Sequence, residues 1–150
     1  MNKTRERDYL KYWRVIRYFV LRKYELNTQE LDMLLFLYSE EYFNVDKFLE
    51  FNKLLGWNKN RFNKLRKQGW IEVIKPYKFG GPKALYGLSF KTLRLLDSVY
   101  DKLEGGIFPT DKSKNPMFLA KAGYTDKIYR KQILELNAAI RQQQCHSHEL

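Results

Sequence analysis

The sequence predicts a mainly helical α+β fold that includes one two-stranded β-hairpin. Apolar residues recur at helical spacings of three and four over most of the chain. Glycines stand where several of these helical patterns end, as is common at helix C-termini. One β-branched and aromatic stretch, 70–77, is followed by a Gly-Gly-Pro turn and a second apolar run, 85–89, which is typical of a hairpin.

The composition is that of a folded, basic chain. Its 150 residues are 44% hydrophobic and 16% aromatic, which suits about one domain with its own core. No run of about 18 apolar residues occurs, and the charged N-terminal stretch lacks the apolar segment of a secretory signal. The single cysteine, Cys145, cannot form an internal disulfide. We therefore expect no membrane association and a cytoplasmic location, in a bacterium or a phage-infected cell.

Three helices are expected in the first part of the chain. Over 5–24, apolar residues alternate with arginines in the pattern of an amphipathic helix. Asn27 or Thr28 can cap the next helix, about 28–42, whose many leucines indicate a central position. A third helix is expected over 44–55, where a glycine follows.

The hairpin stands between two further helical patterns. Asn58 is a candidate N-cap for a short fourth helix that ends at Gly69. After the returning strand, leucines and a tyrosine mark a fifth helix over 93–103, closed by two glycines. A loop with two prolines leads to a last helix around 125–143. The remaining residues, 144–150, show no pattern and are expected to form a flexible tail.

A helix, a glycine-containing turn, a second helix and a hairpin follow one another in the order of a winged helix-turn-helix. In this interpretation 45–55 is the supporting helix and 58–68 is the recognition helix. With Phe62 at the centre of the buried face, steps of about 100° per residue place Leu65 beside it. The outer half then carries Asn60, Asn63, Lys64 and Lys67, with Arg61 and Gln68 at its margins.

The positive charge is segregated along the chain and indicates a polyanionic partner. The formal net charge is +11, and residues 59–95 hold ten Lys or Arg against one acid, whereas residues 28–50 have a net charge of −5. Asparagine can read adenine, while lysine and arginine suit guanine or the backbone. We therefore expect double-stranded DNA as the partner. The expected base-reading residues are Asn60, Asn63 and Lys64, and the expected backbone contacts come from Arg61, Lys67, Lys78 and Lys83. The alternative for this helix is a surface whose basic face contacts only water.

Three segments within 26–103, "LNTQELDMLLFL", "FNKLRKQGWIEVI" and "ALYGLSFKTLRLLDSVYDKL", resemble winged-helix transcriptional regulators of the MarR family. They match, in order, the second helix, the end of the recognition helix with the first wing strand, and the second wing strand with the long helix after it. The family's wing usually carries Asp-x-Arg, and the corresponding residues here are Gly81 and Lys83. Because lysine lacks the planar fork of arginine, we expect the wing to contact mainly phosphates.

The resemblance also implies a homodimer in which the terminal helices, 5–24 and 125–143, interlock. The apolar residues assigned to this interface are Trp13, Ile16, Val20, Ile133, Leu136 and Ile140. The alternative is ordinary packing of these two helices within one chain. We expect a single winged-helix domain over 1–143 with its core at 26–103. The family often binds small aromatic effectors, but no residue can be assigned to such a pocket.

Motifs for catalysis, cofactors or metals are not found in the sequence. The glycine-rich hairpin does not fit G-x-x-x-x-G-K-[ST], and G-x-S-x-G, H-E-x-x-H and paired C-x-x-C are lacking as well. His146 and His148 stand in the expected tail without a second cluster of ligands. We therefore predict that the protein is not an enzyme and uses no cofactor or metal. Two rival functions remain: a winged-helix interaction or assembly module, for example in a phage particle or a replication complex, and RNA binding.

Overall fold

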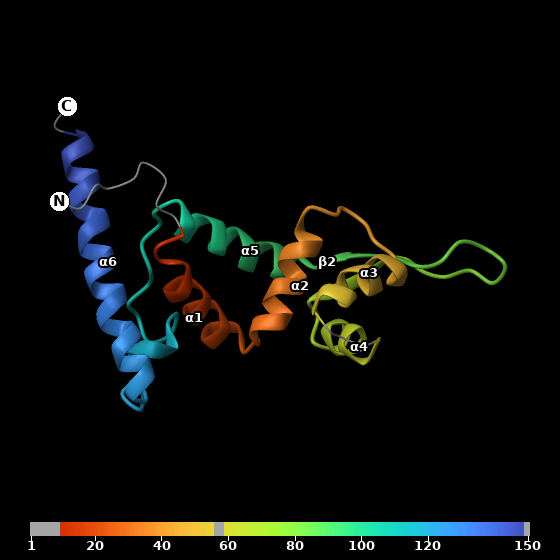
Figure 1. Cartoon of the computed structure of the whole chain (residues 1–150), viewed down its shortest axis with the longest axis horizontal. Helices are drawn as coiled ribbons and strands as arrows, with labels where there is room; N and C mark the ends of the chain where they lie inside the picture. Colours follow the sequence, from red (N-terminus) through yellow and green to blue (C-terminus); the bar gives the residue numbers. More distant parts are fainter. Residues whose placement is uncertain (1–9, 56–58, 149–150) are drawn as a thin grey trace. The chain divides into compact units, whose positions relative to one another are not determined.

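The computed structural model describes residues 10–55 and 59–148 and shows helices with one antiparallel hairpin (Figure 1). The predicted fold class, a mainly helical winged helix-turn-helix, is confirmed. The elements are α1 Trp13–Tyr24, α2 Thr28–Tyr38, α3 Val45–Leu55, α4 Lys59–Lys67, β1 Ile71–Lys75, β2 Leu85–Leu88, α5 Phe90–Leu103, the 3-10 turn η1 Pro116–Phe118, and α6 Tyr124–His148. Within the described ranges, we find no helix with the length and apolar character needed to cross a membrane.

The chain forms two compact units. One runs from Asn27 to Asp97 and contains the helix-turn-helix and the hairpin, and we call it the winged-helix unit. The other joins the N-terminal segment up to Leu26 with the segment from Ser98 onward, and we call it the terminal-helix unit.

The winged-helix unit begins with a capped helix. The side chain of Asn27 accepts a hydrogen bond from the backbone N–H of Glu30 at 2.8 Å, and the Glu30 carboxylate accepts one from the N–H of Asn27 at 3.2 Å. This reciprocal capping box satisfies two N–H groups that the first helical turn leaves without a partner. The helix then buries Leu31, Met33, Leu34 and Leu37 in the core of the unit, as expected for a central helix.

The second helix ends at Tyr38, earlier than the predicted residue 42. The reason is a backbone pairing that sequence periodicity does not reveal. Phe43 and Tyr86 exchange two backbone hydrogen bonds, of 2.9 and 2.7 Å, in an antiparallel bridge. The ring of Phe43 is buried at the same time. For Phe43 to lie in extended backbone, the chain has to leave the helix before it, and residues 39–42 make this turn.

The hairpin pairs Ile71 with Leu88 and Val73 with Tyr86, and its register shifts between Val73 and Lys75. Both strands are shorter than the predicted 70–77 and 85–89. Most of β2 is buried, whereas β1 is exposed after its first residue. The hairpin therefore packs on the helices mainly through β2.

In the terminal-helix unit, aromatic and polar contacts join α1 to the C-terminal segment. The Tyr18 and Tyr129 rings stack with their centroids 3.9 Å apart. The Phe19 ring meets Phe108 edge to face at 5.5 Å. The Asn137 side chain accepts from the backbone N–H of Phe108 at 2.9 Å and donates to its carbonyl at 3.0 Å. These contacts hold the loop after α5 against α6.

Two predicted boundaries in this unit are wrong. Residues 10–12 form a turn and α1 begins at Trp13, while residues 5–9 of the predicted helix lie outside the described residues. The last helix continues through 144–148, where a flexible tail was expected. Neither glycine nor proline occurs after Gly123, so no residue that breaks helices interrupts α6.

The residues assigned to a dimer interface already have partners within the chain. Five of them are buried inside the terminal-helix unit, and Trp13 is partly covered. The five are Ile16, Val20, Ile133, Leu136 and Ile140. The homodimer and its interface stay predictions.

Candidate nucleic-acid interface

The fourth helix is amphipathic, and its apolar face is anchored by Phe62 and Leu65. These side chains are 1% and 0% exposed, as their helical spacing predicts. The Phe62 ring meets Phe48 of α3 and Tyr86 of β2, with both pairs of centroids 4.9 Å apart in edge-to-face geometry. Because Phe62 touches both neighbouring elements, the outer face of α4 has a defined orientation relative to α3 and the hairpin.

The junction between α4 and β1 is held by a glycine cap and by side chains from α5. Gly69 has φ +82°, and the N–H of Trp70 bonds the carbonyl of Leu65 at 3.0 Å, as in a Schellman motif. The hydroxyl of Thr92 donates to the Trp70 carbonyl at 2.6 Å. The Lys91 ammonium lies 3.8 Å from the centroid of the Trp70 ring. The wing therefore leaves the helix in one fixed direction.

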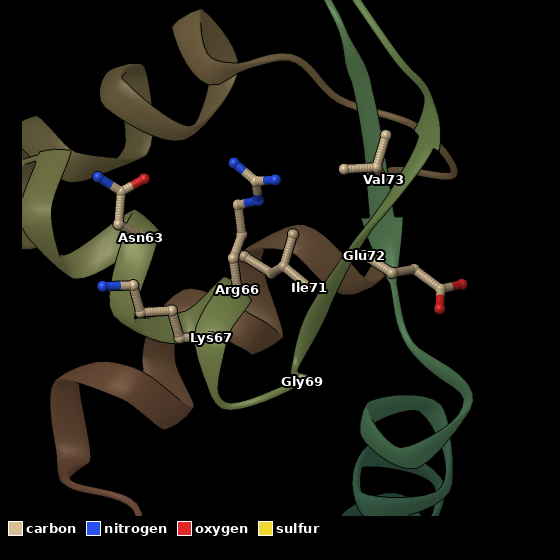
Figure 2. A pocket seen from close by; sticks show the side chains of 7 residues that line it. All are labelled: Asn63, Arg66, Lys67, Gly69, Ile71, Glu72 and Val73. Carbon is tan, nitrogen blue, oxygen red and sulfur yellow. The ribbon is translucent and has the colours of Figure 1, made fainter.

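The outer face of α4 carries the polar side chains that the sequence placed there. Asn60, Asn63, Lys64 and Lys67 are exposed, and Arg61 is partly covered. Asn63 and Lys67 are four residues apart on the helix, and both line the groove beside β1 (Figure 2). The structure thus brings amide and ammonium groups together on one exposed surface, with chemistry that suits base edges and phosphates.

Lys64 on this face has an acidic partner in α2. Its ammonium lies 3.8 Å from the carboxylate of Glu30, whose side chain is buried at the start of α2. The same carboxylate caps α2. Lys64 therefore links α4 to the start of α2.

The two lysines expected on the wing are in different environments. Lys78 is exposed in the loop beyond β1. The Lys83 ammonium forms an ion pair with Asp46 in the first turn of α3. The wing lacks the aspartate expected at Gly81, but α3 supplies a carboxylate to the lysine from another element. Sequence comparison along the hairpin alone could not identify this partner.

Arg66 is a candidate contact that sequence reasoning missed. It is exposed, and its guanidinium lies 4.9 Å from the centroid of the Tyr86 ring. An arginine four residues after Phe62 falls near the buried face on a helical wheel, so it was not placed on the outer half. Its long side chain instead reaches past the core and stacks over the aromatic ring. The spacing from Phe62, together with an aromatic residue in the wing, was the available signal.

Arg66 also lines an open groove between α4 and β1. The groove has a volume of about 560 Å³, and Figure 2 shows the side chains around it. Its lining residues are Asn63, Arg66, Lys67, Gly69, Ile71, Glu72 and Val73. Two cations and an amide on the helix side face a mostly apolar strand with a single acid. The cations suit an anionic group on the helix side of the groove, while the strand side is mostly apolar.

The pKa shifts occur in the terminal-helix unit, away from the helix and wing in sequence. Burial, together with a hydrogen bond to the Asp126 carboxylate, raises the pKa of Tyr18 to about 12. Burial alone would raise the pKa of Asp126, but hydrogen bonds from Tyr18 and Arg22 bring it below its usual range. Asp126 accepts both hydrogen bonds, so we interpret Tyr18, Arg22 and Asp126 as a cluster that stabilises the fold.

Within the described side chains, no group of three or more His, Cys, Asp or Glu is placed to hold a metal ion. The side chains of Cys145, His146 and His148 lie outside the described ones, and so does Asn58, the predicted cap of α4.

Comparisons with known proteins give a structural likeness at low sequence identity. No family model matches the chain, and no curated protein matches it. The chain is similar to the crystal structure of AbfR of Staphylococcus epidermidis with a TM-score of 0.43 and 12% sequence identity. The similarity covers 94% of this chain and 84% of that one.

Proposed function

We propose that this protein binds double-stranded DNA through α4 and the β1–β2 wing and acts as a homodimeric transcriptional regulator of the MarR-like type. The observation that carries the proposal is the amphipathic α4. Its apolar face is fixed by Phe62 and Leu65, while the exposed face presents Asn63 and Lys67. It follows α3 and precedes the wing, which is the position of a recognition helix.

The chemistry of this face favours DNA over a surface that meets only water. Residues 59–69 contain no acid, and the first acid after them, Glu72, stands on the wing. Asn60 and Asn63 have the amide groups that pair with adenine in the major groove. Lys67 and Arg66 are placed for phosphates, and the stacking of Arg66 on Tyr86 limits its motion before binding. Lys64 and Lys83 would contribute only if they leave their acidic partners.

A homodimer would place two recognition helices on two half-sites of DNA. Since the apolar residues first assigned to the interface are covered, the exposed apolar side chains of α6 are the better candidates. They are Tyr124, Ile128 and Leu134. Apolar side chains left on the surface of a helix are frequent where chains associate.

The experiment that tests DNA binding is a fluorescence anisotropy titration over a range of salt, with duplexes selected from a random pool. The affinity should fall steeply with salt because counterions are released from the phosphates. Lys67→Ala should weaken binding and reduce the slope of log K against log salt by about 0.9. Lys112→Ala, at an exposed lysine in the loop before η1, is the matched control and should leave both unchanged. Binding to no duplex, or binding independent of salt, would contradict the proposal.

Charge reversal separates DNA binding from an assembly role. Lys67→Glu is the informative variant, because Lys64→Glu would place a second carboxylate beside buried Glu30 and disturb the fold. Loss of duplex binding in a folded Lys67→Glu protein supports the proposal. Retained duplex binding would argue that α4 does not meet DNA. Competition with structured RNA distinguishes a preference for RNA.

A further inference from the structure

The tip of the wing presents a phenylalanine with no cover from the described residues. Phe79 is 101% exposed, the highest value among the large apolar side chains described. Single exposed apolar residues are ordinary on protein surfaces. What distinguishes Phe79 is its place at the outer end of the hairpin, whose loop projects beyond α3 and α4 (Figure 1). Water is its neighbour in the isolated chain, so a function is the better reason for an aromatic side chain here.

A defined turn holds Phe79 in this position. The N–H of Gly81 donates to the carbonyl of Lys78 at 2.8 Å, which closes a four-residue turn with Phe79 and Gly80 at its corners. Gly80 has φ +75°, as the third residue of a type II turn requires. At Gly81 a Cβ atom would approach the Lys78 carbonyl oxygen to 3.2 Å, so glycine suits the close turn. The turn leaves the ring of Phe79, its first corner residue, fully exposed.

The charge around the ring identifies the kind of partner. Residues 75–83 carry three lysines and no acid. Lys83 is paired with Asp46, while Lys75 and Lys78 are exposed on the same hairpin as the ring. An apolar ring on a basic hairpin fits a surface with anionic groups outside and apolar stacked groups inside. The DNA minor groove has this character, and proteins that bind there insert phenylalanine and similar side chains between base pairs. A membrane has it too, but one phenylalanine buries too little area to hold a protein there.

We propose that Phe79 is a wedge that inserts between base pairs in the minor groove and kinks the duplex, an inference that rests on the proposed DNA binding by α4. The helix supplies most of the contact and positions the wing. Lys75 and Lys78 meet the flanking phosphates while the ring displaces one base step. The wing then distinguishes DNA sequences by how easily a base-pair step deforms. Steps such as TA, which unstack readily, are preferred.

The test measures bending and affinity on a short duplex with a central TA step and a dye at each end. Energy transfer should report a bend with the wild-type protein, no bend with Phe79→Ala, and a bend with Phe79→Leu, which keeps an apolar wedge. Phe79→Ala should bind roughly tenfold more weakly with an unchanged salt slope, because no phosphate contact is lost. Lys78→Ala should reduce the slope by about 0.9 and keep the bend.

Controls separate the wedge from folding and from DNA binding itself. Phe90→Ala changes another exposed phenylalanine, at the start of α5, and should alter neither bend nor affinity. Thermal unfolding of Phe79→Ala should match the wild type, because the ring packs against no core. Equal bending by wild type and Phe79→Ala overturns the wedge and leaves the proposed function standing. No duplex binding by the wild type at low salt overturns both. Phe79-dependent binding to phosphatidylserine vesicles without duplex binding would assign the tip to membranes.

Discussion

Asp126 is a buried acidic residue whose charge is tied to the packing of the terminal-helix unit. Its carboxylate accepts hydrogen bonds from the Tyr18 hydroxyl and, at 2.9 Å, from the Arg22 guanidinium. The carboxylate lies in the first turn of α6, where a negative charge also interacts favourably with the helix dipole. One ionised group therefore links α1 to the start of α6.

Lowering the pH should weaken this cluster. Because the folded-state pKa of Asp126 is lowered, its contribution is present above the unfolded value of about 4 and is lost as pH falls through the folded value. Asp126→Asn should reduce the free energy of unfolding at neutral pH by about 1–3 kcal/mol and flatten its acid dependence. Urea titrations from neutral to acidic pH measure both effects.

The Tyr18 hydroxyl of the same cluster predicts a loss of folding stability at alkaline pH. The pKa of Tyr18 is raised, so its contribution is present below about 10 and is lost as pH rises toward about 12. Tyr18→Phe should remove this loss.

Asp111→Asn is a control for the loss of stability at acidic pH, since a hydrogen bond from the Ser113 backbone lowers the pKa of exposed Asp111 without joining two segments. Equal acid sensitivity of Asp126→Asn and the wild type would contradict the assignment.

Lys64 and Lys67 are a matched pair on one helix face with different partners. Lys64→Ala removes the cation beside buried Glu30 and should lower the free energy of unfolding by at most about 1 kcal/mol, because Lys64 is half exposed. Lys67→Ala should leave stability unchanged. Chemical unfolding of both variants, with DNA affinity measured in parallel, checks this difference. A greater loss of stability in Lys67→Ala would show that the ion pair has been misassigned.

At the scale of elements, the end of α4 depends on backbone geometry that only some residues adopt. Gly69 has φ +82°, and no atom lies within 4 Å of a Cβ added there. A side chain at this position would therefore meet open space, and its cost would be conformational alone. The glycine cap is also where α4 ends and the chain enters β1.

Gly69→Ala should lower the free energy of unfolding by about 1 kcal/mol, because a Cβ atom disfavours the left-handed backbone. Gly69→Asn should cost less, since asparagine enters that conformation more readily. Differential scanning calorimetry of both variants ranks them against the wild type. Identical unfolding temperatures for all three proteins would mean that the cap contributes nothing to stability.

The elements show how far sequence reasoning reaches. Helical periodicity correctly placed Phe62 and Leu65 inside and Asn63 outside, because these positions follow from geometry along one helix. It misplaced the end of α2, where Phe43 bonds to Tyr86 across 43 positions of sequence. It also missed Arg66, whose contact is with the ring of that same tyrosine. Both errors involve a partner that lies far away along the chain.

At the scale of the whole molecule, the proposed function requires a second copy of the chain. We expect a dimer in sedimentation equilibrium at micromolar concentration. Leu134 is 48% exposed on α6, and Leu134→Lys should shift the equilibrium toward monomer while the fold is kept. Ile140→Lys is a contrasting variant that should unfold the protein, because Ile140 is buried within the chain. A wild-type monomer at all concentrations would contradict the dimer and leave DNA binding by one chain to be tested separately.

The sequence by itself determined the helices, the hairpin, the amphipathic face of α4 and the basic charge around it. These follow from propensities and periodicities that act between near neighbours along the chain. Only the tertiary structure decided that Lys64 pairs with Glu30, that Lys83 pairs with Asp46, and that Arg66 rests on an aromatic ring. It also placed Phe79 at the uncovered corner of the wing. The physical reason is that a side chain's partners and exposure depend on which distant segments packing brings beside it, and no local pattern records that arrangement.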